Sequence, residues 1–242
     1  MRLPEHEREA HRQAFRAMSL PQKLEYIFAY YKLPLVLIFI AAVALGSHLH
    51  YRFTHKEPVL YVAYCNVGLP EEQDQELFDG FLASMGADPK TQESYRYYNL
   101  YLSEAEESVD HQYSYASRLK TLAAVDAEEL DVVFMNQGAY DLLSASGYLM
   151  DLSSTLAASG TLQDQANDLL TTNVVVLEDN RLEVELNEAD TYEAVTQEVP
   201  NALDVTEALG GTDVLTGTVY LGIIGNTPRL DTALSFVSYL LG

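Results

Sequence analysis

The pattern of apolar and polar residues divides the chain into one long uncharged segment and a later series of short apolar runs. Residues 33–49 contain no Asp, Glu, Lys or Arg, and no polar stripe interrupts the run from Leu35 to Leu45. A helix that crosses the hydrocarbon core needs about 20 mostly apolar residues, and roughly 17 can suffice. Aromatic residues flank the run on both sides, where lipid headgroups would lie. The pattern therefore predicts a transmembrane helix over residues 33–52.

The same segment also has features of a cleaved signal peptide. Ala42-Val43-Ala44 and Ala44-Leu45-Gly46 both match the small-x-small pattern of a cleavage site. However, thirty-two residues precede the apolar run, which is longer than an ordinary signal-peptide n-region. We therefore expect an uncleaved single-pass anchor in the cell membrane, with the signal peptide as the alternative.

The distribution of basic residues predicts the orientation of this anchor. Only Arg52 and Lys56 lie just beyond the span, whereas six basic residues precede it. Because cytoplasmic flanks are enriched in Lys and Arg, the N-terminus is expected in the cytoplasm and the C-terminal domain outside. The six are Arg2, Arg8, Arg12, Arg16, Lys23 and Lys32.

Residues 1–32 form the expected cytoplasmic tail, and its last part has the pattern of an amphipathic helix. Residues 19–22, Ser-Leu-Pro-Gln, can form a capping box. An apolar stripe follows at helical spacing, which predicts a short helix before Pro34 redirects the chain. We expect the stripe to lie on the inner leaflet, although a cytoplasmic partner would use the same face. The stripe consists of Leu24, Ile27, Phe28 and Tyr31.

Residues 57–242 form the expected extracytoplasmic domain, in which strand-like and helix-like patterns alternate. A βαβαβα order predicts an α/β fold with a mainly parallel sheet. Within it, Leu119 and Leu122 are expected to face the core, and Leu130–Met135 is apolar enough to be a central strand buried on both faces. The predicted elements, in order, are Val59–Val67, Glu71–Met85, Tyr95–Leu102, Tyr113–Val125, Leu130–Met135 and Ala139–Ser146.

The second part of the domain is less regular. A hairpin is predicted around residues 178–181, with its strands over Asn173–Leu177 and Leu182–Leu186. Another strand is predicted from Tyr192 to Val199, where Pro200 stops it, and Asp204–Leu209 has the pattern of a short helix. The chain ends with a strand over Thr218–Ile224 and a helix capped by Asn226-Thr227-Pro228.

Composition excludes several classes of function. Residues 57–242 carry thirty-two acidic against six basic residues, a formal charge of −26. Nucleic acid and anionic lipid would be repelled by such a domain. A single cysteine, Cys65, excludes an intramolecular disulfide. The acidic runs match no calcium loop, and no nucleophile–base pair or metal constellation can be assembled, so we expect no enzyme, no cofactor and no metal.

Two stretches resemble a known family. Residues 130–143 with 147–152, and 219–227 with 233–240, resemble segments of the extracellular solute-binding proteins of ABC importers, which are type II periplasmic-binding-protein-like. Ser19–Pro34 also resembles anchors of single-pass Gram-positive surface proteins. The resemblance implies two α/β lobes with a ligand cleft between them. Only the first lobe is complete in this sequence, which predicts a three-layer parallel-sheet lobe followed by a reduced second lobe.

Two functions are compatible with this resemblance. The first is an anchored module that holds a small polar solute, such as a sugar, an amino acid or a peptide, for a membrane transporter. The second is a degenerate binding-protein scaffold that serves as a non-catalytic interaction or assembly subunit of a membrane complex. An open cleft with converging polar groups would favour the first, and a filled cleft with an exposed apolar patch would favour the second.

The candidate binding residues lie where predicted strands end. Ligands of open α/β sheets bind outside the carboxyl ends of the strands, and a helix that starts there points free N–H groups at the ligand. Turn-forming and helix-capping roles explain the same residue types equally well. The candidates are Asn66, Gly68, Tyr101, Ser103, Asn136, Gln137, Gly138 and Asn226.

Overall fold

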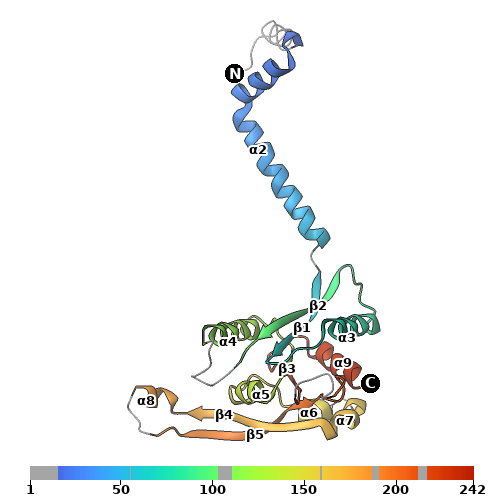
Figure 1. Cartoon of the computed structure of the whole chain (residues 1–242), viewed down its shortest axis with the longest axis vertical. Coiled ribbons are helices and arrows are strands. Elements are labelled where there is room, and N and C mark those ends of the chain that lie inside the picture. The colour runs from blue at the N-terminus through green and yellow to red at the C-terminus, as the bar shows by residue number, and fades with distance from the viewer. Residues whose placement is uncertain (1–15, 55, 103–110, 159, 187–190, 212–216) are drawn as a thin grey trace. The chain divides into compact units, whose positions relative to one another are not determined.

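The computed structural model describes residues 16–54, 56–102, 111–158, 160–186, 191–211 and 217–242. The chain divides into two compact units, Met1–His55 and Lys56–Gly242. The first unit contains one long helix, α2, and the second contains all the described strands (Figure 1).

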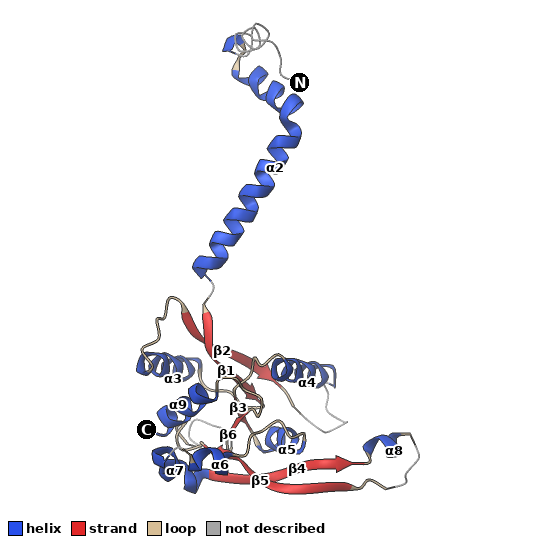
Figure 2. Cartoon of the chain, turned by 180° about the vertical axis from the view of Figure 1, so that it is seen from behind, coloured by secondary structure: helices blue, strands red, loops and turns tan. Residues whose placement is uncertain are grey.

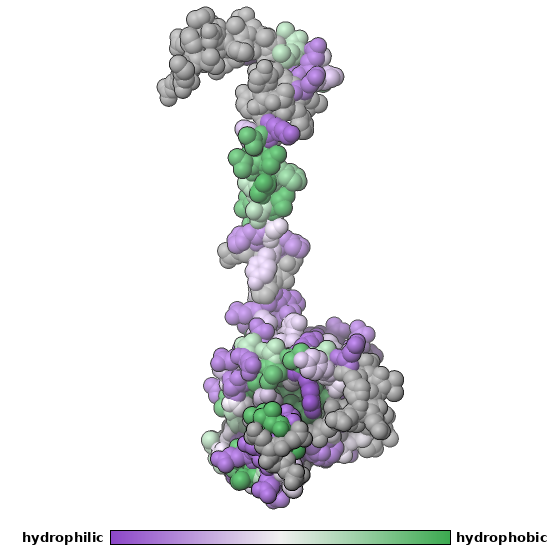
Figure 3. All heavy atoms as spheres, turned by 90° about the vertical axis from the view of Figure 1, so that its left-hand side faces the viewer, coloured by the Kyte–Doolittle hydropathy of each residue, from purple (hydrophilic) through white to green (hydrophobic). Residues whose placement is uncertain are grey.

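Helix α2 (Leu20–Thr54) runs through the uncharged segment without interruption. The prediction of a short separate helix before Pro34 was wrong, because Pro34 lies inside α2. A proline removes one backbone hydrogen bond, and long apolar helices tolerate that loss. Residues 32–51 have a mean hydropathy of 2.0, and Figure 3 shows much of this stretch as a green apolar band. Among the described helices this one alone is long and apolar enough to span a membrane, and its place near the N-terminus fits a signal sequence equally.

The start of α2 has one of the two predicted capping-box contacts. The Ser19 N–H donates to Gln22 Oε1 at 3.0 Å, and the Lys23 N–H donates to the Ser19 carbonyl at 2.9 Å. The side chains of the predicted amphipathic stripe, at residues 24, 27, 28 and 31, lie outside the described residues. The membrane-surface role of that stripe stays a prediction.

The strands of the second unit form a single mixed sheet in the order β2-β1-β3-β6-β5-β4 (Figure 2). β1 pairs in parallel with β2 and with β3, as predicted. β6 runs antiparallel to β3, and β5 runs antiparallel to both β6 and β4. The strands are β1 (Glu57–Cys65), β2 (Gln92–Leu100), β3 (Val132–Met135), β4 (Leu170–Asp179), β5 (Ala194–Asp204) and β6 (Tyr220–Ile223).

The expectation of a mainly parallel sheet therefore holds only for the first half of the domain. A parallel pair needs a crossover connection, usually a helix. The predicted helix at 204–209 is instead the end of β5 and a turn, so no described helix crosses between β5 and β6. β4 and β5 extend the same sheet, so the stretch expected to form a reduced second lobe belongs to the one compact unit.

The predicted hairpin has different strands from those expected. The stretch over Leu182–Leu186 is mostly helix α8 (Arg181–Glu185), and the partner of β4 is β5. β5 continues past Pro200, which was expected to stop it. Pro200 pairs with Thr172 at a register shift, the kind of irregularity at which a strand accepts a proline.

Strand β3 is central and buried on both faces, as predicted. Val132 and Phe134 belong to one core cluster, and Val133 and Met135 belong to the other. The first cluster includes residues of α3, α6, α7 and α9, and the second includes residues of α4 and α5 (Figure 1). These helices are α3 (Glu71–Ser84), α4 (His111–Asp126), α5 (Gln137–Ala145), α6 (Leu152–Ala157), α7 (Gly160–Ala166) and α9 (Leu230–Leu241), and a 3₁₀ turn (Asn167–Leu169) follows α7.

Helix α4 lies on the sheet with the opposite face from the one expected. Leu119 and Leu122 are 48% and 38% exposed, so the prediction that they face the core was wrong. The buried face instead presents small hydroxyl residues, Ser114, Ser117 and Thr121. Thr121 Oγ1 donates to the Ser117 carbonyl at 2.9 Å, so its hydroxyl needs no partner in the sheet.

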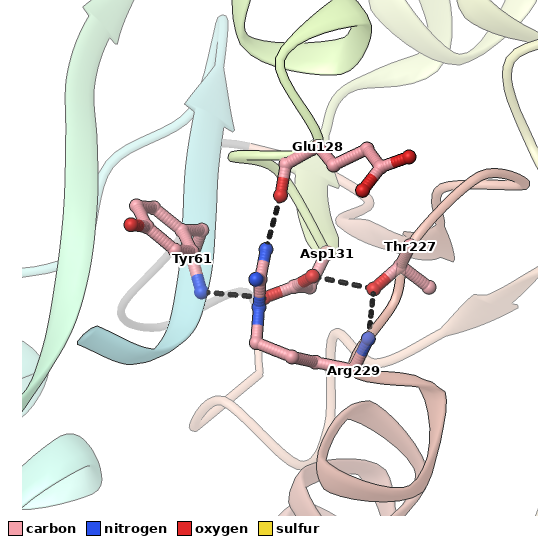
Figure 4. A network of polar contacts seen from close by, with 5 residues as sticks. All are labelled: Tyr61, Glu128, Asp131, Thr227 and Arg229. Atoms are coloured by element: carbon pink, nitrogen blue, oxygen red, sulfur yellow. Dashed lines mark hydrogen bonds and ion pairs between the residues drawn. The ribbon is translucent and has the colours of Figure 1, made fainter. Parts of the chain in front are cut away.

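A buried aspartate links the C-terminal segment to the sheet through hydrogen bonds and an ion pair (Figure 4). Asp131, just before β3, is fully buried and accepts hydrogen bonds from the Tyr61 N–H at 2.8 Å and from Thr227 Oγ1 at 2.5 Å. Arg229 Nε lies 2.9 Å from the same carboxylate and its guanidinium stacks over the Tyr61 ring. Thr227 thus serves this network, and α9 begins at Leu230 without a side-chain cap, rather than at the predicted Asn-Thr-Pro cap.

Candidate functional site

Two of the predicted site residues meet at the carboxyl ends of the parallel strands. Asn66 follows β1 with a positive φ of 60°, and Asn136 follows β3 as the N-cap of α5. Asn66 Nδ2 donates to Asn136 Oδ1 at 3.1 Å and to the Leu102 carbonyl at 2.6 Å. The Leu102 N–H donates to Asn66 Oδ1 at 2.8 Å, and the Ala139 N–H donates to Asn136 Oδ1 at 3.0 Å. These side chains therefore close the strand ends with bonds inside the chain.

The other candidates near these strand ends add little to a converging polar site. Gly68, Gly138 and Tyr101 are exposed. Gln137 is also exposed, and its amide donates to Asp141 Oδ1 at 2.7 Å within α5. Ser103 lies outside the described residues.

Asn226 does not join the other candidates, so the expected convergence of three strand ends was wrong. β6 runs antiparallel to β3. The carboxyl end of β6 therefore lies beside the amino end of β3, whereas Asn136 follows the carboxyl end of β3. There Asn226 Nδ2 donates to the Val125 carbonyl at 2.8 Å, at the end of α4. The prediction assumed a parallel last strand, and the direction of that strand depends on tertiary pairing.

A hollow of the second unit lies elsewhere, between α4 and the outer end of β4. It is a groove of about 580 Å3. α4 forms one wall, the C-terminal half of α5 and Tyr148 contribute further lining, and the last residues of β4 with Arg181 line the other side. We call this the α4–β4 groove. It is lined by Leu102, Tyr115, Arg118, Leu119, Thr121, Leu122, Leu142, Leu143, Ala145, Ser146, Tyr148, Val176, Leu177, Glu178, Asp179 and Arg181.

Large apolar side chains stand exposed along this groove. Tyr115, Leu119 and Leu122 follow each other at helical spacing on α4, and Tyr115 is 65% exposed. Opposite them, Leu177 of β4 is 56% exposed. Figure 3 looks onto this side of the domain and shows green apolar surface among purple polar residues. An exposed apolar patch of this kind marks interaction surfaces.

The β4 wall is held in place by a buried polar network from α5. Tyr140 Oη lies 2.9 Å from the Thr171 carbonyl oxygen and 2.9 Å from Asn201 Oδ1, so its single O–H is shared between these two acceptors. Asn201 Nδ2 donates to Ser144 Oγ at 2.8 Å, and Ser144 Oγ donates to the Val174 carbonyl at 2.9 Å. Burial is the main cause that raises the pKa of the Tyr140 phenol, so this donor keeps its proton over the physiological range. The network fixes the first half of β4 against α5.

The charged residues of the groove balance each other. Arg181 lies 3.9 Å from Asp179, which is close to the limit of an ion pair, and Glu178 is the second acid. Arg118 is exposed and forms no ion pair with another described residue. A neutral groove with one unpaired cation is thus present in a domain whose formal charge is −26.

The described residues contain no group of three or more metal-ligating side chains. Burial raises the pKa of the Cys65 thiol to about 12, so this side chain is a neutral core residue at physiological pH. The second buried carboxylate, Asp74, accepts from Tyr64 and from Tyr98 and lies 3.3 Å from Arg96, which ties β1 and β2 to α3. These groups serve the fold, and the open groove is a concave surface available to a ligand or partner.

Sequence reasoning missed the groove because it assigned the apolar face of α4 to the core. The signal that would have found it is the second stripe on the same helix, at Ser114, Ser117 and Thr121. Small residues let a helix approach a sheet closely, so the face of α4 with the hydroxyl residues can pack on the sheet. The apolar face of the same helix is then left exposed and available for an external contact.

Comparisons with known proteins give no family to which the chain belongs. No family model matches it, and no curated protein or solved structure matches it either.

Proposed function

We propose that this chain is a single-pass membrane protein whose extracytoplasmic domain is a non-catalytic interaction module, and that its α4–β4 groove binds a partner of a membrane complex. In this proposal the N-terminus is cytoplasmic and residues 33–52 anchor the chain, as the distribution of Lys and Arg indicates. The helices that pack on both faces of the mixed sheet support a three-layer lobe in this proposal.

The exposed apolar face of α4 carries the proposal. A helix that covers a sheet normally buries its large apolar residues and exposes its polar ones. In α4 the hydroxyl residues are buried while Leu119 and Leu122 line an open groove. At the same time, Asn66 and Asn136 of the expected solute site bond to the chain itself. This combination supports the interaction role over the solute-binding role.

Site-specific photocrosslinking in intact cells tests the interaction. A photoreactive amino acid at Leu119 should give a discrete adduct with a second protein. The same amino acid at Tyr239, an exposed aromatic of α9 outside the groove, is the matched control and should give none. The Leu119 adduct should disappear when Leu122→Asp adds a charge to the groove. Equal adducts from both positions, or an adduct that survives Leu122→Asp, would contradict the proposal.

A second candidate function is the binding of a small solute for a membrane transporter such as an ABC importer. The size of the groove supports it, because ligand pockets commonly measure about 300–1,000 Å3 and have mostly apolar walls with a few polar groups. Thermal shift of the full chain with sugars, amino acids and short peptides distinguishes the two. A solute that raises the melting temperature, and does so no longer in the Leu122→Asp variant, would establish the solute-binding role instead.

Protease treatment of intact cells tests the topology. The acidic domain should be digested and the tail protected, since the tail carries most of the basic residues near the span. Full protection of the domain would reverse the orientation. Loss of residues 1–44 from the mature protein would identify the apolar segment as a signal peptide.

A further inference from the structure

The last residues of β4 line the α4–β4 groove, and α5 covers the outer edge of this strand at Val174. β4 ends the sheet order, so no described strand pairs with its outer side. The N–H of Val174 is satisfied by Asn173 Oδ1 at 2.7 Å, and its carbonyl accepts from Ser144 Oγ at 2.9 Å. The peptide groups of Val174 therefore point away from β5, toward this edge.

The next peptide groups with the same direction belong to Val176. In an antiparallel pair the residues alternate between bonding to the partner strand and pointing away from it. Val174 pairs with Glu198 and Val176 with Thr196 in unbroken register, and the register shifts after Val176, so the N–H of Val176 also points outward. α5 ends at Ala145, and Val176 lines the groove. A sheet edge with outward peptide groups is a template for a further strand.

We propose that the groove binds an extended segment of a partner protein, which adds as a strand to β4 at Val176 and covers the apolar stripe of α4. This inference rests on the interaction role proposed above and names the form of the partner. Main-chain bonds to Val176 would supply affinity, and alternate side chains of the segment would pack against Leu119 and Leu177.

The charges of the groove define the composition of the segment. Arg118 stands on the α4 wall without an ion partner among the described residues, so an acidic side chain of the segment would meet it. The rest of the domain is strongly acidic and repels a segment that carries many negative charges. The segment is therefore mostly apolar and neutral, with one acidic residue opposite Arg118.

Selection from a displayed library of short random peptides, against the full chain in lipid nanodiscs, tests the proposal. The selected peptides should alternate apolar and polar residues and contain an acid. Replacing alternate amide hydrogens of such a peptide by methyl groups should abolish binding, because the side chains remain while the strand bonds are lost. Val176→Pro removes the outward N–H and should weaken binding in the same way, at an edge position that tolerates proline.

Charge reversal provides the matched control. Arg118→Glu should weaken binding by at least roughly tenfold, and replacing the acid of the peptide by lysine should restore it. Lys90→Glu makes the same change of net charge outside the groove and should have no effect. Peptides with apolar residues at helical spacing, or binding that survives amide methylation, would overturn strand addition while the photocrosslink from Leu119 still stands. Failure of both experiments would overturn the interaction role itself.

Discussion

The helices α9 and α4 cover opposite faces of the sheet, and they differ in which side chains they bury against it. On one face, α9 packs Phe236 against Phe78 and Phe81, with ring centroids 5.2 and 5.1 Å apart, and these rings are buried. On the other face, α4 packs Ser117 and Thr121 inward and leaves Leu119 outside. Aromatic packing of the first kind stabilises the fold, whereas the second kind leaves apolar area exposed at a stability cost. The difference shows that α9 buries its large apolar side chains, and it supports the external contact proposed for α4.

The largest expected effect is on the α9 face. Phe236→Ala removes a fully buried ring and should lower the free energy of unfolding by about 3–5 kcal/mol. Denaturant unfolding followed by circular dichroism measures this change. A loss below about 1 kcal/mol would show that this face is not the stabilising one, and the contrast between the helices would fail.

A smaller loss of stability is expected when a small buried side chain of α4 is replaced by a large one. Ser117→Leu places a large side chain against the sheet where a small one is 4% exposed, and overpacking should cost about 1–3 kcal/mol. Leu119→Ser, two residues along the same helix, is the matched control and should change stability by no more than about 0.5 kcal/mol. If Leu119→Ser proved the more destabilising of the two, α4 would bury its apolar face after all.

The strand-end asparagines should behave as structural residues. Asn136→Ala removes the N-cap of α5 and the acceptor for Asn66, and should cost about 0.5–2 kcal/mol. The same denaturant measurement applies. Gln137→Ala, at the neighbouring exposed position, is the control and should be close to neutral. Unchanged stability of Asn136→Ala would return this residue to the list of candidate binding residues.

The smallest expected effect is a decline of stability at alkaline pH. No such decline is expected near neutral pH. Burial and the hydrogen bond to Asp74 raise the pKa of Tyr98 from 10.0 to about 12. A phenol whose folded pKa exceeds its unfolded pKa binds more protons in the folded state, so its contribution to stability is full below pH 10 and is lost between pH 10 and 12. Denaturant unfolding at stepped pH should show this decline, and Tyr98→Phe should make it shallower. If the free energy of unfolding of Tyr98→Phe fell with pH at the same slope, Tyr98 would be excluded as the cause of the decline.

Local patterns were sufficient for most individual elements. The continuous apolar run of β3 predicted a strand buried on both faces, because such a run has no polar face to expose. The βαβαβα order of the first half predicted the parallel pairing of β1 with β2 and β3. The uncharged segment over residues 33–49 predicted the one described helix that is long enough to span a membrane.

The rest depended on contacts between residues far apart in the chain. The strand direction of β6 is set by its pairing with β3 and β5, and that direction separates Asn226 from Asn66 and Asn136. Periodicity predicted that α4 buries the face with Leu119 and Leu122, whereas packing against the sheet buries the face with Ser117. The sequence by itself therefore determined where most strands and helices of the first half of the domain lie. The tertiary structure decided which faces are buried and which strand ends meet, because burial and pairing are properties of the assembled sheet.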